Sequence, residues 1–200
     1  FFLKTLTRIL LPLSVIMAII LAFNGTPTSY KGKDTFISMQ GDTVHVSRGP
    51  AAGMIAIKHL GTNGGGWFGV NSAHPLENPN YLTNVVEIVA QVIIPIALVF
   101  ALGFYLKKKK FAYVMFGVMT VGMLMFLFPT MNAEISGSPA IARMGISQPT
   151  GAIEGKEVRI GPANTAYWST MTTIISTGSV NSMHDSAMPA SGFMMLMAMM

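Results

Sequence analysis

The sequence predicts an all-α integral membrane protein, and three observations carry that prediction. Of the 200 residues, 51% are hydrophobic and 10% are charged, with a mean hydropathy of +0.52, whereas soluble domains carry about 25% charged residues. Several apolar segments are long enough to cross a bilayer, which takes about 20 residues. Between two of them lies the glycine-rich stretch GTNGGGWFG at 61–69, whose bare peptide groups must be buried in protein or line a wet cavity.

The first half of the chain, residues 1–106, has the order span, polar loop, short helix, glycine turn and span. The short helix has ten residues, too few to cross a bilayer. Alternating residues in the polar loop, such as Thr43 to Val46, favour a short hairpin. The expected elements are a span at 3–23, an outer loop at 24–50, a short helix at 51–60, a turn at 61–66 and a span at 82–106.

The second half, residues 107–200, has the same order and stops within an apolar run, so we interpret the chain as a fragment of a longer protein. Its first span is expected to end at Phe128, before a polar loop that starts at Pro129. The expected elements are a span at 111–128, an outer loop at 129–162, a short helix at 164–175, a turn at 176–181 and the start of a span at 189–200.

The two halves also match residue by residue. Thr62-Asn63-Gly64 pairs with Ser176-Thr177-Gly178, and the sequence NSAHP at 71–75 pairs without a gap with DSAMP at 185–189, always 114 positions apart. Together with the matching hydropathy, this constant offset indicates an internal duplication.

Lysines at 107–110 suggest the orientation of the chain. They lie between the two complete spans that separate the turns, and positively charged loops stay in the cytoplasm. We therefore expect the lysine loop to be cytoplasmic and both turns to face outward, and Lys4 and Arg8 at the start of the first span agree. This interpretation also explains much of the net charge of +5, so we expect no nucleic-acid partner.

The turns have the chemistry of a cation filter. The end of a helix carries roughly −0.5 of a charge and favours a cation, and glycine permits positive φ, so that successive carbonyls can point to one side. Hydroxyls of Thr62, Ser176 and Thr177 add further oxygens. Rings of neutral oxygens replace the hydration shell of a monovalent ion. The alternative is a tight packing site or a flexible connector.

Other features give weaker signals. Glu87 lies on one helical face with Asn84 and Gln91, and an ionisable residue within a span is a functional candidate; the alternative is an ion pair or hydrogen bond inside the bundle. The histidines lack metal-ligand spacing. A phosphate cradle is a poor fit, because its glycines precede a helix. His184 and Asp185 leave open a remote alternative, an intramembrane enzyme.

The stretch GTNGGGWFGVNSAHPLENP at 61–79 resembles the signature of the KdpA family, the potassium-binding subunits of bacterial Kdp potassium-transporting ATPases. The resemblance covers essentially the whole chain. It implies a potassium-channel-like fold of four span–pore helix–filter–span repeats, of which this chain holds the second and most of the third. The filter residues it implies are Thr62, Asn63, Gly64, Ser176, Thr177 and Gly178.

The resemblance further implies a multi-pass subunit of the bacterial plasma (inner) membrane that binds extracellular K⁺ and passes it toward a KdpB-like P-type ATPase subunit. A KdpC-like subunit and a small peptide subunit would complete the complex within the lipid bilayer. The chain itself would have no catalytic residue and no organic cofactor. A nearer alternative is a Trk- or Ktr-like potassium-translocating subunit, which lacks a P-type ATPase.

Overall fold

The computed structural model describes residues 2–200 and is mostly helical; Phe1, the first residue of the first predicted unit, lies outside them. Three helical segments are long and apolar enough to cross a membrane: Phe2–Phe23, Tyr81–Tyr105 and Lys109–Arg143. Two shorter apolar helices are Ala51–Leu60 and Pro189–Met199. The arrangement fits a membrane protein, as the composition predicts.

The first span is interrupted close to its start. It consists of α1 (Phe2–Thr5), the π-helical turn η1 (Leu6–Leu10) and α2 (Leu11–Phe23). Pro12 lies in the first turn of α2, directly after the wide turn. A residue without a backbone N–H is tolerated at a helix start, where that donor has no helical partner.

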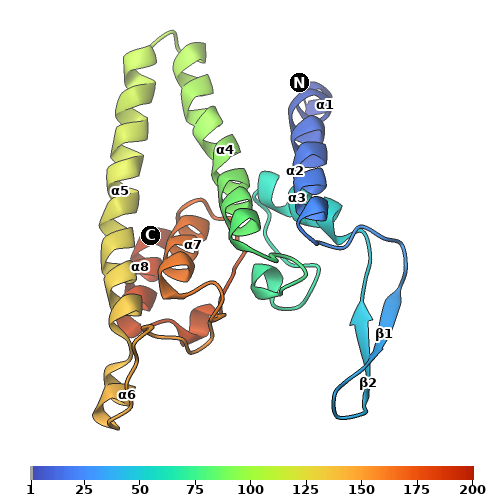
Figure 1. The fold of residues 1–200 in the computed structure, drawn as a ribbon. Coiled ribbons are helices and arrows are strands. Elements are labelled where there is room, and N and C mark those ends of the chain that lie inside the picture. Colours follow the sequence, from blue (N-terminus) through green and yellow to red (C-terminus); the bar gives the residue numbers. More distant parts are fainter. Residues whose placement is uncertain (1) are drawn as a thin grey trace.

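The loop after α2 carries the hairpin that the alternating residues predict. Strand β1 (Lys33–Ile37) pairs antiparallel with β2 (Thr43–Ser47), with Lys33 opposite Ser47. The Arg48 guanidinium and the Asp34 carboxylate lie 2.8 Å apart at its base. In Figure 1 the hairpin projects away from the helices.

Helix α3 (Ala51–Leu60) packs against α2 through small side chains. Met17 and Leu21 of α2 form a buried cluster with a row of residues on α3 and with Ala90 of α4 (Tyr81–Tyr105). Alanines on α3 let the helices approach closely, as small residues do in membrane proteins. The buried members on α3 are Ala51, Ala52, Ile55, Ala56 and Leu60.

Helices α4 and α5 (Lys109–Ser136) form a long antiparallel hairpin (Figure 1). A side chain on Gly103 of α4 would collide with Ala112 of α5, so the two helices touch at a glycine. Helix α5 continues past Pro129, where the sequence predicts its end. Proline is tolerated inside apolar spans, and the buried residues Thr130 and Glu134 beyond it contact the last part of the chain.

The remaining elements fold back on α5. They are α6 (Pro139–Arg143), α7 (Pro162–Ile174), the 3₁₀ turn η3 (His184–Ser186) and α8 (Pro189–Met199). Helix α6 lies within the segment predicted as a loop, and α7 begins two residues before the predicted start, because proline is favoured in the first helical turn. Helix α7 packs on α5 and α8, as α3 packs on α2 and α4.

Candidate ion-binding loops

Helix α3 ends in a hydrogen-bonded turn that fixes the next residues. The N–H of Thr62 donates to the carbonyl of His59 at 3.1 Å, and the N–H of Asn63 donates to the carbonyl of Lys58 at 3.2 Å. This pair of bonds is the Schellman motif, which satisfies carbonyls at a helix end. The glycine-rich stretch therefore starts from a defined geometry.

Helix α7 ends in the same turn. The N–H of Ser176 donates to the carbonyl of Thr173 at 3.2 Å, and the N–H of Thr177 donates to the carbonyl of Thr172 at 2.9 Å. Every donor and acceptor of this turn lies 114 positions after its counterpart at the end of α3. The two loops thus leave their helices with one backbone geometry.

The backbone dihedrals agree between the two loops. Thr62 and Ser176 both adopt left-handed conformations, with φ of 53° and 55°, and Gly64 and Gly178 have φ of 69° and 78°. A left-handed non-glycine residue costs roughly 1–3 kcal/mol and is held only where its surroundings determine it. The repeated pattern therefore reflects a conformation that both helix ends impose.

Carbonyl oxygens of the two loops are unpaired, and so are the N–H groups of Gly64 and Gly178 among residues 2–200. The first N–H groups of the loops bond back to the helices, whereas six carbonyl oxygens accept no hydrogen bond from any residue of 2–200. Carbonyls in this state attract a cation, because an unpaired acceptor carries a partial negative charge. The six belong to Thr62, Asn63, Gly64, Ser176, Thr177 and Gly178.

The two loops lie against each other. A Cβ placed on Gly64 would be 2.6 Å from the carbonyl carbon of Gly178 and 2.8 Å from the amide nitrogen of Ser179, and it would also collide with the carbonyl oxygen of Thr177. Such distances leave room only for hydrogen. The sequence-predicted segments, more than a hundred positions apart, are thus in main-chain contact.

A buried histidine joins the end of α3 to the second loop. His59 Nε2 lies 3.0 Å from Ser179 Oγ, and His59 Nδ1 lies 2.9 Å from the carbonyl oxygen of Ile55. The indole N–H of Trp168 donates to the carbonyl of Ser179 at 2.9 Å. Burial, with a further contribution from the Lys58 ammonium, lowers the pKa of His59 well below 6.5, and the hydrogen bond to Ile55 opposes the shift.

A buried ion pair between Lys58 and Glu77 supports the first loop. The Lys58 ammonium lies 2.6 Å from a carboxylate oxygen of Glu77, and it also donates to Ser72 Oγ at 3.1 Å. The second carboxylate oxygen of Glu77 accepts the N–H of Phe68 at 2.8 Å. This network ties both ends of the glycine-rich stretch to one buried charge pair.

Polar residues of α4 extend the network across the two halves. Asn84, Glu87 and Gln91, which the sequence places on one face, are all buried. Asn84 Oδ1 accepts a hydrogen bond from Asn181 of the second loop at 3.2 Å, and Glu87 lies 3.5 Å from His59 Nε2. Neither carboxylate oxygen of Glu87 has a hydrogen-bond partner among the described residues, so the structure does not supply the hydrogen bond of the structural alternative, and the functional role of Glu87 stays a prediction.

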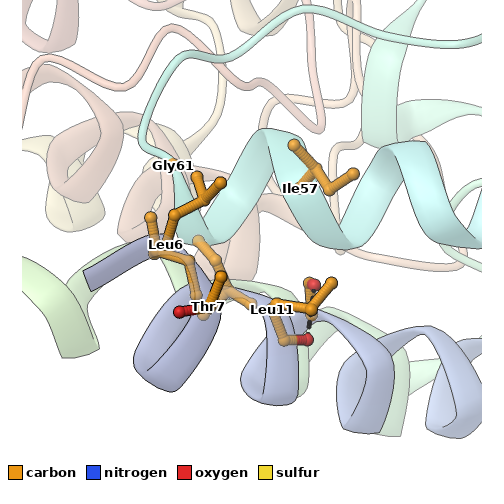
Figure 2. A pocket seen from close by; sticks show the side chains of 8 residues that line it. Leu6, Thr7, Leu11, Ile57 and Gly61 are labelled. Carbon is orange, nitrogen blue, oxygen red and sulfur yellow. Dashed lines mark hydrogen bonds between the residues drawn. The ribbon is translucent and has the colours of Figure 1, made fainter. Parts of the chain in front are cut away.

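Two hollows border the loops and differ in chemistry. Ser176 and Gly178 line a hollow of about 580 Å³ together with residues of α8. A groove of about 240 Å³ beside Gly61 is walled by apolar side chains such as Leu6, Leu11 and Ile57 (Figure 2). The apolar groove holds the side-chain hydroxyls of Thr7 and Ser14, whereas the larger hollow also borders the second loop itself.

The chain matches one protein family over its whole length. The family described as KdpA, potassium-transporting ATPase A subunit, matches residues 1–200. The chain belongs to the KdpA family. This whole-chain match favours KdpA over the Trk and Ktr alternative.

Three curated relatives of the KdpA chain carry the same description. The potassium-transporting ATPase potassium-binding subunit of Flavobacterium psychrophilum is 69% identical over 200 residues, which are the whole chain and 35% of the relative. That of Flavobacterium johnsoniae is 65% identical over the same coverage. That of Geobacillus kaustophilus is 43% identical over 199 residues and 36% of its length. The chain thus spans about a third of the length of these relatives.

These KdpA relatives bear the name of the potassium-binding subunit, and not of a catalytic one. His184 and Asp185, the residues of the enzyme alternative, lie in the turn η3. Asp185 stands beside His184 in sequence, and His184 Nε2 is buried without a partner among the described residues.

Sequence reasoning missed most of the groups that support the loops in this KdpA chain. Lys58 is a charged residue within a short apolar helix. An ionisable residue in an apolar membrane segment is a functional candidate, so the argument that selected Glu87 applies to Lys58 as well. Glu77, Ser179 and Trp168 gave no such signal, because their partners lie far away in the sequence or in the main chain.

Proposed function

We propose that this chain is part of the potassium-binding and translocating subunit of an ATP-driven potassium uptake complex. In this proposal, Thr62, Asn63 and Gly64 form one quadrant of a selectivity filter, and Ser176, Thr177 and Gly178 form the next. The KdpA family and the names of its relatives support potassium as the transported ion.

One observation carries the filter assignment. Both loops use their first N–H groups to cap the preceding helix and leave the carbonyls of the same residues unpaired, with identical spacing and matching φ values. Oxygens of this kind replace the water of a weakly hydrated monovalent ion, whereas Ca²⁺ collects carboxylates. The main-chain contact at Gly64 further supports two neighbouring quadrants around one axis.

The same proposal interprets the chain as two channel-like repeats. The first covers residues 1–106, with α3 as its pore helix, and the second covers 107–200, with α7. Matching packing of α3 and α7 against their flanking helices supports this division. Two further repeats, outside this chain, would complete the filter.

The proposed setting is the bacterial inner membrane. Lysines at 107–110 favour a cytoplasmic position for the tip of the α4–α5 hairpin, which puts both loops toward the outside. ATP hydrolysis would take place in a KdpB-like partner, with a KdpC-like subunit and a small peptide subunit in the complex.

A structure of the whole complex in potassium, and again in rubidium, tests the filter. We expect ion density within ligand distance of the carbonyls of both loops, stronger with the heavier ion. Density confined to other parts of the complex would contradict the assignment. Co-purification of the subunit with a phosphorylatable P-type ATPase tests the proposed partner.

A further inference from the structure

We propose that His59 is a positioning residue for potassium selection, which holds the second loop from the end of the first short helix through Ser179. The inference rests on the proposed function of the two loops. In this inference His59, which is not itself a filter residue, fixes the position of the second loop relative to the first.

The hydrogen-bond pattern defines the state of the imidazole. The carbonyl oxygen of Ile55 can only accept, so Nδ1, at 2.9 Å, carries the proton. In the neutral ring Nε2 is then an acceptor, and Ser179 Oγ donates to it at 3.0 Å. The edge of the ring faces the indole of Trp168, with centroids 5.7 Å apart, which further restricts its orientation.

Ser179 is placed to set the direction of a filter carbonyl. Its amide nitrogen belongs to the same peptide group as the carbonyl of Gly178, and peptide groups are planar. Ser179 is held at its hydroxyl by His59 and at its carbonyl by Trp168. Fixing this fully buried residue therefore limits how far the Gly178 carbonyl can rotate.

His59 contacts both loops at once. Its own carbonyl accepts the N–H of Thr62 in the turn that starts the first loop, while its side chain reaches the second. Thr173, the residue 114 positions later, accepts the N–H of Ser176 in the same way, but its hydroxyl bonds to Ser169 within its own helix. The side chain of Thr173 therefore makes no link between the loops, unlike that of His59.

The test compares variants of the full-length subunit within its assembled complex. His59→Leu and Ser179→Ala each remove the bond, and His59→Gln keeps an acceptor oxygen near the position of Nε2. We expect the first two to raise the half-saturating K⁺ concentration about tenfold, the worth of one buried hydrogen bond, and to weaken discrimination against Na⁺. His59→Gln should restore most of both. Thr120→Val, which removes a hydroxyl that bonds only within α5, should change neither.

The double variant His59→Leu with Ser179→Ala decides whether the two residues act together. A shift no larger than that of one single variant supports the direct link, and a summed shift overturns it. The amount of assembled complex is measured alongside, because Ser179→Ala preserves volume and tests the link even if His59→Leu assembles poorly.

A filter variant, Gly64→Asp, separates this inference from the proposed function. If Gly64→Asp alters potassium selection while His59→Leu and Ser179→Ala leave it unchanged in an assembled complex, the role of His59 is refuted and the filter stands. If Gly64→Asp also leaves potassium selection unchanged, the proposed function fails as well.

Discussion

Gly64 and Gly178 meet main chain to main chain, with space only for hydrogen at Gly64. The two residues also hold similar left-handed conformations, with φ of 69° and 78°. The contact joins two loops that the sequence separates by a complete pair of spans. A change at Gly64 therefore acts on both loops together.

Gly64→Ala and Gly64→Asp should weaken potassium affinity and selectivity, and the aspartate more strongly. Any Cβ there displaces the main chain of Thr177 to Ser179, and aspartate also adds a charge beside the carbonyls. Potassium uptake by the full-length complex, with sodium as competitor, measures the effect. Gly69→Ala is the matched control, because nothing lies within 4 Å of its Cβ and its φ is not left-handed. Normal uptake and discrimination in Gly64→Asp would count against the filter.

Lys58→Met should destabilise the subunit by about 3–5 kcal/mol, because it leaves the buried carboxylate of Glu77 without its partner. Adding Glu77→Gln should recover part of the loss, since the amide oxygen still accepts the N–H of Phe68 and the uncompensated charge is gone. The melting temperature of the purified complex reports both changes. Equal melting of the single and the double variant would show that the charge pair contributes little.

Residues 1–200 alone should not transport potassium. The family resemblance implies four filter quadrants, and the proposal assigns two of them to this chain. Vesicles that contain the purified segment and a potassium-sensitive dye provide the measurement, with vesicles of the full complex as the positive control. Sustained potassium flux through the segment alone would contradict the expectation.

Gly103→Leu should separate α4 from α5, because its side chain would enter the space of Ala112. Overpacking of this kind costs about 1–3 kcal/mol, which we expect as a lower melting temperature of the complex. Gly117→Leu on α5 is the control, since nothing lies within 4 Å of a Cβ at that position. A similar loss in both variants would indicate an effect of helix propensity or lipid exposure instead.

Stability should fall as the pH drops below about 6.5, in part through His184. Burial lowers the pKa of His184 from 6.5, with Asp185 opposing the shift, so the unfolded chain binds the proton more readily. The contribution of this residue is complete above the unfolded pKa and is lost as the pH falls toward the folded one. His184→Gln should flatten the melting profile between pH 7.5 and 5. His45→Gln, in the exposed hairpin, should not; an unchanged slope in His184→Gln would remove this residue as the cause.

The long and short helices could be predicted because lipid restricts the choices. A bilayer requires about 20 apolar residues per helix, so segments such as 82–106 differ clearly from the ten residues at 51–60. The residues at which the helices end were harder to predict. Helix α5 continues through Pro129, because the contacts of Thr130 and Glu134 outweigh the one backbone hydrogen bond that proline removes. The duplication of the two turns could also be predicted, because a constant offset of 114 positions is read directly from the sequence and does not depend on which residues are close in space.

The supporting network could not be predicted from the sequence. His59 and Ser179 are 120 positions apart, and a serine within the polar stretch 176–186 has many possible partners. The main-chain contact of Gly64 depends on how two helix pairs dock, which hydropathy does not report. The ion-binding roles of Thr62 to Gly64 and Ser176 to Gly178 stay predictions until an ion is observed there.

The α4–α5 hairpin has a consequence for how such a molecule could grow. If each proposed unit crosses the membrane twice, the even number of crossings returns the chain to the side from which it started. Head-to-tail copying of such a unit would then require no inversion, because the short helix of every copy would lie on the same side. The proposed filter quadrants could accumulate in one polypeptide and then diverge separately, whereas identical subunits encoded by one gene must all keep the same sequence.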